Sequence, residues 1–145
     1  MLNRIVTISF MVFSFVGCAH TGLDTLASGK NVQKAVVLMP RVHFVFDSDR
    51  LTPEGRGIIY HNVGWMKENP AEIIILEGHC DERGSADYNL YLGDRRARVV
   101  RSELVAMGAD DDSLIIISYG EERPLDVARN REAWRRNRRV EFVVR

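Results

Sequence analysis

Four segments of the chain carry the short apolar pattern that is typical of β-strands. Residues 42–46 (VHFVF) are β-branched and aromatic and are followed by the polar turn DSDR. Residues 72–79 and 113–120 each contain a continuous run of isoleucine and leucine. In residues 139–144 (RVEFVV) apolar residues alternate with other residues, which places the apolar ones on one face. We therefore predict four strands.

The segment between the first two strands has apolar residues at helical spacing. Thr52 and Pro53 have the pattern of an N-cap followed by the first helical residue, and the helix is predicted to end near Asn69 and Pro70. Its inner positions are Ile58, Ile59, Val63 and Met66.

A second helix is predicted over about residues 86–107, with a break near Gly93. Gly108 follows it directly and suits the left-handed conformation that ends many helices. A short third helix is predicted over residues 129–136. The inner face of the second helix contains Ala97, Val100, Leu104 and Met107.

These elements follow one another as β-α-β-α-β-(α)-β. Because helices and sheets bury their apolar sides against each other, this order predicts an α+β domain of two layers, with helices packed on one mixed four-stranded sheet. The first crossovers should place their strands parallel, and the last strand is the candidate for an antiparallel neighbour. The 145 residues, of which 46% are apolar, suffice for one such domain.

The N-terminal residues have the pattern of a secretory signal. An apolar run over residues 5–17 follows the positive start MLNR and is too short to cross a bilayer as a helix. Small Gly17 precedes Cys18, as in the lipobox of bacterial lipoproteins; the alternative is an ordinary signal peptide with a chance cysteine. The expected layout is a signal peptide (1–17), the lipidated Cys18 with a flexible linker (18–35), and a folded domain (36–145).

A lipid on Cys18 would anchor the domain near a membrane surface. Stable anchoring takes more than one acyl chain. The resemblance to bacterial lipoproteins implies three acyl chains on the cysteine. Ala19 rather than Asp follows the cysteine, which is consistent with delivery to the outer membrane. Of the two cysteines only Cys80 would then remain, so no disulfide could form within the chain.

The overall charge gives no indication of nucleic-acid binding, because Lys+Arg and Asp+Glu are 20 each. The charge is nevertheless uneven, since residues 129–145 contain many arginines against only Glu132 and Glu141. Such a cluster suits a discrete anionic ligand or forms a solvated helix face, and the pattern alone leaves both possibilities open.

Residues 78–89 (GHCDERGSADYN) concentrate groups that could perform chemistry. A Cys80 nucleophile needs a nearby base, but adjacent residues at a strand end point to opposite faces, so His79 is poorly placed to serve. His79 and Asp81 alternate onto one face, yet no HxxxH or CxxC companion completes a metal site. We therefore expect neither an enzyme nor a metal site, and Cys80 is interpreted as a small, partly buried filler.

A pair of opposite charges is the stronger interpretation. Asp81 lies just beyond a strand end, and the loop containing Gly84 can fold back toward Arg95 and Arg96 on the second helix. Such a pair offers an acceptor for an ammonium beside a planar donor for a carboxylate. From the residues alone, a structural Asp–Arg salt bridge is an equally good explanation.

Four separated blocks then identify a family resemblance. FDSD, EGHCDERGSADYNLYLGDRRARVV, SYGEERP and RRNRRVEFVV resemble, in order and spacing, the OmpA-like peptidoglycan-binding domain over about residues 36–145. With the lipobox in front, the whole chain resembles the peptidoglycan-associated lipoproteins. The resemblance implies a two-layer βαβαββ domain that binds the diaminopimelate residue of the cell-wall peptide without covalent chemistry, cofactor or metal.

The resemblance also implies the site residues. The family's key aspartate corresponds to Asp81, and its key arginine to Arg96. Arg96 would grip the terminal carboxylate of diaminopimelate with two parallel hydrogen bonds while Asp81 accepts from the ammonium. Lysine, which lacks that carboxylate, would leave Arg96 unmatched. The remaining implied pocket residues are Asn89 of the YN motif and Phe44, Phe46 and Asp47 of the FxFD stretch.

The implied role is a tether between the outer membrane and the cell wall. The lipid would lie in the outer membrane on its periplasmic face, and the domain would bind peptidoglycan as part of the Tol–Pal system, which supports envelope integrity and cell division. TolB is an implied partner, although no residue identifies its interface. Another OmpA-like wall anchor, associated with a stator or an efflux pump, is the alternative, and an enzyme acting on peptidoglycan ranks third.

Overall fold

A computed structural model of the protein describes residues 39–145. The predicted signal peptide (1–17), Cys18 with the predicted linker (18–35), and residues 36–38 of the predicted domain therefore lie outside the described part. None of the helices in this part is long and apolar enough to span a membrane. The elements are β1 (Val42–His43), α1 (Gly55–Glu68), β2 (Ile74–His79), α2 (Ala86–Ala106), a 3-10 turn (Asp111–Ser113), β3 (Leu114–Gly120), α3 (Arg131–Asn137) and β4 (Arg139–Val144).

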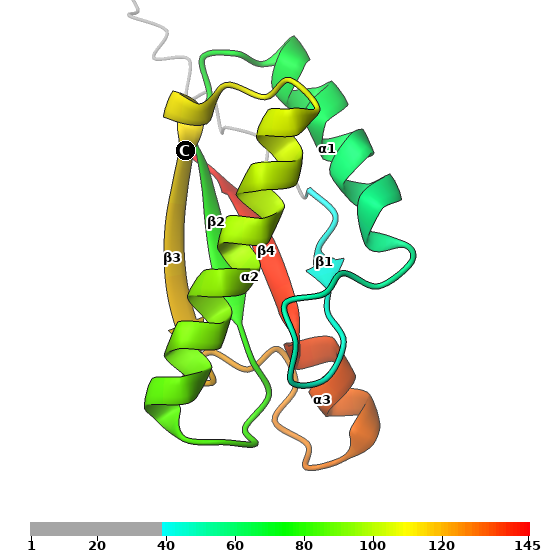
Figure 1. The fold of residues 1–145 in the computed structure, drawn as a ribbon, viewed down its shortest axis with the longest axis vertical. Coiled ribbons are helices and arrows are strands. Elements are labelled where there is room, and N and C mark those ends of the chain that lie inside the picture. The colour runs from blue at the N-terminus through cyan, green and yellow to red at the C-terminus, as the bar shows by residue number, and fades with distance from the viewer. Residues whose placement is uncertain (1–38) are drawn as a thin grey trace, which may run out of the picture. The chain divides into compact units, whose positions relative to one another are not determined.

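The strands form one mixed sheet in the order β1-β4-β2-β3. β2 and β3 are parallel, whereas β4 runs antiparallel to both β1 and β2. Helices α1 and α2 pack on the sheet, and α3 precedes β4 at one end of the molecule (Figure 1). The predicted two-layer α+β fold is confirmed. The position of β4 between β1 and β2 was not predicted, because the sequence of a strand does not determine which strands lie beside it in the sheet.

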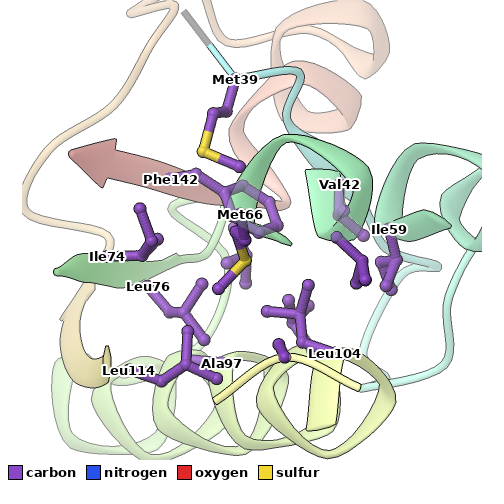
Figure 2. Close-up of a cluster of buried hydrophobic side chains, with 14 of the residues drawn as sticks. Met39, Val42, Ile59, Met66, Ile74, Leu76, Ala97, Leu104, Leu114 and Phe142 are labelled. Atoms are coloured by element: carbon purple, nitrogen blue, oxygen red, sulfur yellow. The ribbon is translucent and has the colours of Figure 1, made fainter. Parts of the chain in front are cut away.

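The hydrophobic core fills the space between the sheet and the two long helices (Figure 2). Alternate residues of the strands point into it, among them Leu76 from β2 and Phe142 from β4. The helices contribute the side chains that helical spacing predicted: Ile59, Val63, Met66, Ala97, Val100 and Leu104 are buried, and Ile58 and Met107 pack at the edge. Burial of each large side chain contributes about 1.5–3 kcal/mol.

Strand β1 is shorter than the predicted strand over residues 42–46. Phe44 forms a single antiparallel bridge with Leu51, and the Val45 amide donates to the Arg50 carbonyl at 3.1 Å. The chain has therefore already turned back on itself, and Asp47 within the turn has a left-handed φ of 48°. The result is a tight loop before α1 that places Phe46 and Asp47 at the end of the sheet.

The predicted start of α1 was wrong. The helix begins at Gly55 with Glu54 as N-cap, and within the described residues the Glu54 side chain makes no capping hydrogen bond. The Gly55 amide instead donates to the Thr52 carbonyl at 3.0 Å, so Thr52 and Pro53 belong to a turn that precedes the helix. The TP pair is typical both of such a turn and of a helix start, and the sequence does not distinguish the two.

The predicted break of α2 near Gly93 was also wrong, since the helix is continuous. A Cβ atom at Gly93 would collide with the hydroxyl of Ser118, and one at Gly78 would overlap the carbonyl of Gly93. The two glycines therefore allow the backbones of β2 and α2 to approach closely. The predicted helix end is confirmed, as Gly108 has a φ of 95°.

We predict that Gly78→Ala destabilises the domain by more than about 2 kcal/mol, because the new methyl group forces helix and strand apart. Gly64→Ala is the matched control, since nothing lies within 4 Å of a Cβ at that exposed position of α1. The control should stabilise the domain by about 0.5–1 kcal/mol. Urea unfolding of both variants checks the pair, and equal effects of the two substitutions would contradict the close-contact explanation.

His79 ends β2 with its imidazole buried on the sheet face opposite the core, as strand alternation predicts from the inward direction of Leu76. Neither ring nitrogen has a hydrogen-bond partner among the described residues. The ring stacks against Tyr119 with centroids 5.7 Å apart, and Nε2 lies 3.8 Å from Oε2 of Glu77. Burial and the nearby Arg139 lower the pKa of His79 from 6.5 to about 4, and Glu141 only partly opposes them.

The stability of the domain should consequently fall as the pH drops from 6.5 toward 4. In this window the unfolded chain takes up a proton at His79 and the folded chain does not, so the contribution of the neutral ring is complete above pH 6.5 and is lost below it. The difference corresponds to about 3 kcal/mol.

Denaturant unfolding at pH 4, 5, 6 and 7 measures this contribution as the difference in the free energy of unfolding between the parent and His79→Phe. His61→Gln, at an exposed position of α1, is the control that should leave the slope unchanged. Identical pH profiles for the parent and His79→Phe would show that the buried ring is not responsible.

Candidate ligand-binding site

The loop before α1, the loop before α2 and helix α3 lie at the same end of the domain (Figure 1). Residues of the two loops, of α2 and of the segment after α3 line a small cavity. The residues that line it are Phe46, Asp47, Cys80, Asp81, Arg83, Tyr88, Asn89, Leu92, Arg96 and Arg138. Five of the residues that the resemblance implies are among them: Asp81, Arg96, Asn89, Phe46 and Asp47. Phe44, which the FxFD stretch also implied, is not a lining residue and is buried in the hydrophobic core. The fold thus brings together residues from three segments that are far apart in the sequence.

The guanidinium of Arg96 is almost completely buried, with 1% of the residue exposed. Its Nε donates to the Ser48 carbonyl at 3.0 Å and its Nη2 to the Val45 carbonyl at 3.3 Å. Nη1 donates to the His79 carbonyl at 2.9 Å and to Sγ of Cys80 at 3.2 Å. Four of the five N–H groups of a guanidinium are therefore bonded to protein atoms.

The structural Asp81–Arg96 salt bridge, the alternative that the residues alone left open, does not occur within residues 39–145, where the hydrogen-bond partners of Arg96 are backbone carbonyls and one thiol. Burial lowers the pKa of Arg96, but an arginine stays protonated even so. The group is a fixed positive charge that joins the loop before α1 to the end of β2. Among the described residues its hydrogen bonds leave one N–H at Nη2 without a partner, whereas the predicted bidentate contact with a carboxylate uses two.

Asp81 is buried as well, with 4% of the residue exposed, and two other arginines are its partners. Oδ1 accepts from Nε of Arg83 at 2.9 Å, and Oδ2 accepts from Nη2 of Arg83 at 2.8 Å and from Nη1 of Arg138 at 3.1 Å. Burial opposes ionisation of the carboxyl group, but these hydrogen bonds outweigh it and hold the pKa below its ordinary value. Asp81 is therefore a carboxylate at neutral pH.

Arg83 closes the cavity. Its guanidinium carbon lies 4.0 Å from the ring centroid of Phe46 and 4.2 Å from that of Trp134, so two aromatic side chains flank the group that grips Asp81. The indole of Trp134 is in turn held by a hydrogen bond from Nε1 to Glu82 at 3.2 Å. With these side chains in place, the cavity encloses only about 10 Å³, roughly the room for one water molecule.

Asn89 and Cys80 fix the loop that carries Asp81. Nδ2 of Asn89 donates to the Asp81 carbonyl at 3.2 Å and also to Oε2 of Glu121. The Cys80 thiol donates to the Asn89 carbonyl at 3.3 Å while its sulfur accepts from Arg96. Cys80 is thus fully buried and hydrogen-bonded, more than the partly buried filler that we predicted.

The surroundings of Cys80 do not activate its thiol. Burial raises the pKa of Cys80 to about 11, so the sulfur is a neutral thiol at pH 7. The adjacent His79 ring stacks on Tyr119, away from the sulfur's own partners. No group of three or more metal-ligating side chains occurs within residues 39–145.

Asp47 and Tyr88 form the other rim of the cavity. The Tyr88 hydroxyl donates to Oδ1 of Asp47 at 2.5 Å, which raises the pKa of the phenol. This bond connects the loop before α1 to the first turn of α2, whose Ser85 N-cap accepts from the Tyr88 amide at 3.2 Å. Phe46, about half exposed, stands beside it at the entrance.

Sequence reasoning missed Arg83, Arg138 and Tyr88. Arg83 follows Asp81 by two residues, and a short turn whose backbone amide bonds back to the carboxylate makes that spacing favourable. Arg138 lies in the arginine cluster over residues 129–145. Other members of that cluster pair with nearby carboxylates or backbone carbonyls: Arg129 with Glu82, Arg135 with Glu132, Arg136 with Asp126, and Arg139 with Glu141 and the Arg123 carbonyl.

Comparisons with known proteins identify the family and the fold of this chain. The peptidoglycan-associated lipoprotein of Pseudomonas aeruginosa is 39% identical over 88% of this chain and 88% of the relative, and that of Pseudomonas putida is 33% identical over 88% and 87%. The crystal structure of the peptidoglycan-associated lipoprotein from Burkholderia pseudomallei is similar with a TM-score of 0.69 at 32% identity, over 72% of this chain and 89% of that one.

A more distant likeness concerns the fold alone. The C-terminal domain of Helicobacter pylori MotB matches with a TM-score of 0.68 at 21% identity, over 73% of this chain and 84% of that one. The sequence profile of the OmpA family itself matches residues 43–138, which include every lining residue of the cavity. With such relatives the domain is a binding module rather than an enzyme. The chain belongs to the OmpA family.

Proposed function

We propose that the protein is an outer-membrane lipoprotein whose domain binds the diaminopimelate residue of the peptidoglycan peptide and so tethers the membrane to the cell wall. The observation that carries the proposal is the buried carboxylate of Asp81 among arginines, at the position where the OmpA family motif places its key aspartate. The relatives named peptidoglycan-associated lipoproteins support it, since the chain matches them over most of its length.

The charges that line the cavity suit the end of diaminopimelate. That end is one carbon carrying an ammonium and a carboxylate. Asp81 accepts from the ammonium, while the three arginines that line the cavity exceed its two aspartates and favour a ligand that brings a carboxylate. Arg96 contributes its buried charge and its one remaining N–H. Asn89 holds the loop, and Phe46 with Asp47 forms the rim that the ligand passes.

Loss of the Asp81 charge should abolish most of this binding. Removing a charge-assisted hydrogen bond costs about 1.5–3 kcal/mol, so Asp81→Asn should weaken affinity for a diaminopimelate-containing muropeptide about ten- to a hundred-fold. Because the pKa of Asp81 lies below its ordinary value, binding by the parent should be constant between pH 5 and 8. Isothermal titration calorimetry measures both effects.

Asp94→Asn is the matched control for that titration. Asp94 lies on α2 and pairs with Arg98 one turn away, at a surface position outside the cavity. The control should bind like the parent, and the mass of the muropeptide should be unchanged after incubation with any of the three proteins. Undiminished affinity of a folded Asp81→Asn variant would contradict the site assignment.

The membrane anchor rests on the sequence alone, since Cys18 lies outside the described residues. We propose that Cys18 is lipidated after removal of residues 1–17 and that residues 18–35 connect the lipid to the domain. TolB and other Tol proteins are the proposed protein partners, as for other lipoproteins of the Tol–Pal system.

Cys18→Ser should prevent processing and release the protein from membranes, because the hydroxyl cannot take up the lipid that anchors it. Membrane fractionation with intact-mass measurement tests this, with Cys80→Ala as the control that should stay membrane-bound. Normal membrane association and mature mass of Cys18→Ser would overturn the anchor.

A further inference from the structure

We propose that Arg83 is an exchangeable counter-ion: it occupies Asp81 in the free protein and passes to the carboxylate of the incoming ligand, so that the cavity selects zwitterionic ends over simple amines. The inference rests on the proposed function, because it concerns how the same cavity distinguishes diaminopimelate from lysine. The family resemblance implied that Arg96 selects diaminopimelate over lysine, and we assign this selection to Arg83 instead.

The ligand ammonium cannot reach Asp81 while Arg83 is in place. Both carboxylate oxygens accept from the Arg83 side chain, and Oδ2 also accepts from Arg138. The remaining cavity of about 10 Å³ is far too small for an amino-acid end. At least one of the arginines that surround the cavity must therefore move before the carboxylate can bind anything else.

Arg83 is the arginine that can move. Arg96 is 1% exposed and has four protein acceptors, and the Arg138 side chain is 12% exposed with its Nε bonded to the Phe44 carbonyl at 3.1 Å. The Arg83 side chain is 35% exposed, and within residues 39–145 the acceptors of its guanidinium are the two oxygens of Asp81. Its other contacts are the faces of Phe46 and Trp134, along which a planar guanidinium can slide.

The exchange conserves charge pairing only for a zwitterion. The ligand ammonium takes the place of Arg83 at Asp81, and the ligand carboxylate takes the place of Asp81 at Arg83, so one internal ion pair becomes two pairs with the ligand. A lysine side chain would displace Arg83 equally but leave it without a partner, in a lining that already has more arginines than aspartates. An unpaired charge of this kind is strongly disfavoured, which gives the specificity.

The first arm of the experiment detects the movement through Trp134. In a Trp65→Phe background Trp134 is the only tryptophan, and its ring carries the Arg83 guanidinium at 4.2 Å. Titration with a diaminopimelate-containing muropeptide should change its fluorescence along the binding curve measured by calorimetry. The same titration of Arg83→Ala in that background should bind with little fluorescence change. Binding without a signal in the parent, or an equal signal in both, would overturn the exchange.

The second arm measures specificity as the ratio of affinities for muropeptides containing diaminopimelate and lysine. Arg83→Ala should lower this ratio at least ten-fold, because Asp81 becomes free for any amine and the carboxylate loses its partner. Arg83→Lys keeps the charge without the planar fork and should give an intermediate ratio. Arg135→Ala, an α3 arginine whose side-chain partner is Glu132, should leave it unchanged.

The outcomes separate this inference from the proposed function. A parent that binds neither muropeptide, or an unimpaired Asp81→Asn, removes the proposed function and the inference with it. Asp81-dependent binding with an unchanged ratio in a folded Arg83→Ala leaves the proposed function intact and overturns the role of Arg83. If Arg83→Ala fails to fold, the parent fluorescence and the Arg83→Lys ratio still decide the question, since both retain a cation at Asp81.

Discussion

The site depends on one buried cation, the guanidinium of Arg96. A charge without water must be matched by hydrogen bonds, and Arg96 finds them in the carbonyls of Val45, Ser48 and His79. These carbonyls belong to the loop before α1 and to the end of β2, segments that nothing in the local sequence would hold together. The contact of Gly78 with Gly93 brings α2 close enough for the side chain to reach both. Arg96 thus fixes the inner wall of the cavity.

Around this fixed charge, burial divides the ionisable groups into two kinds. Arg96 and Arg138 donate to backbone carbonyls and are largely buried, and Arg138 also donates to Asp81. The more exposed Arg83 donates from its guanidinium to Asp81, the proposed ligand-binding carboxylate. Asp81 remains ionised because guanidinium groups compensate for its burial. A domain that must be stable without ligand can keep a buried carboxylate in this way, provided that one of its partners is able to leave. In the proposed mechanism, recognition is an exchange of partners in which the Asp81 carboxylate always has a cationic partner.

The pattern of apolar residues was sufficient to predict the two-layer fold, whereas the candidate site residues were implied by the resemblance to the OmpA-like domain. Helical spacing identified Val100 and Leu104, and the spacing of Asp81 from Arg96 placed both at one end of the sheet. The sequence did not identify the hydrogen-bond partners of Asp81 and Arg96, because a hydrogen bond depends on side-chain directions that are determined only in the folded domain. The sequence also did not show that Gly93 allows α2 to pack closely on β2 and does not interrupt the helix, since a glycine is compatible with either role.

The account is tested most directly by the Nε–H signals of the arginines in a nitrogen-15 NMR titration with diaminopimelate-containing muropeptide. Each of the three arginines at the cavity has its own Nε environment, with Arg96 bonded to Ser48, Arg138 to Phe44 and Arg83 to Asp81. The account predicts a large shift of the Arg83 signal at saturation, while the signal of Arg96 stays near its free position and remains protected from exchange with water. A shifted, exchanging Arg96 signal beside an unmoved Arg83 would contradict it, because the ligand would then be gripped by the cation that holds the fold.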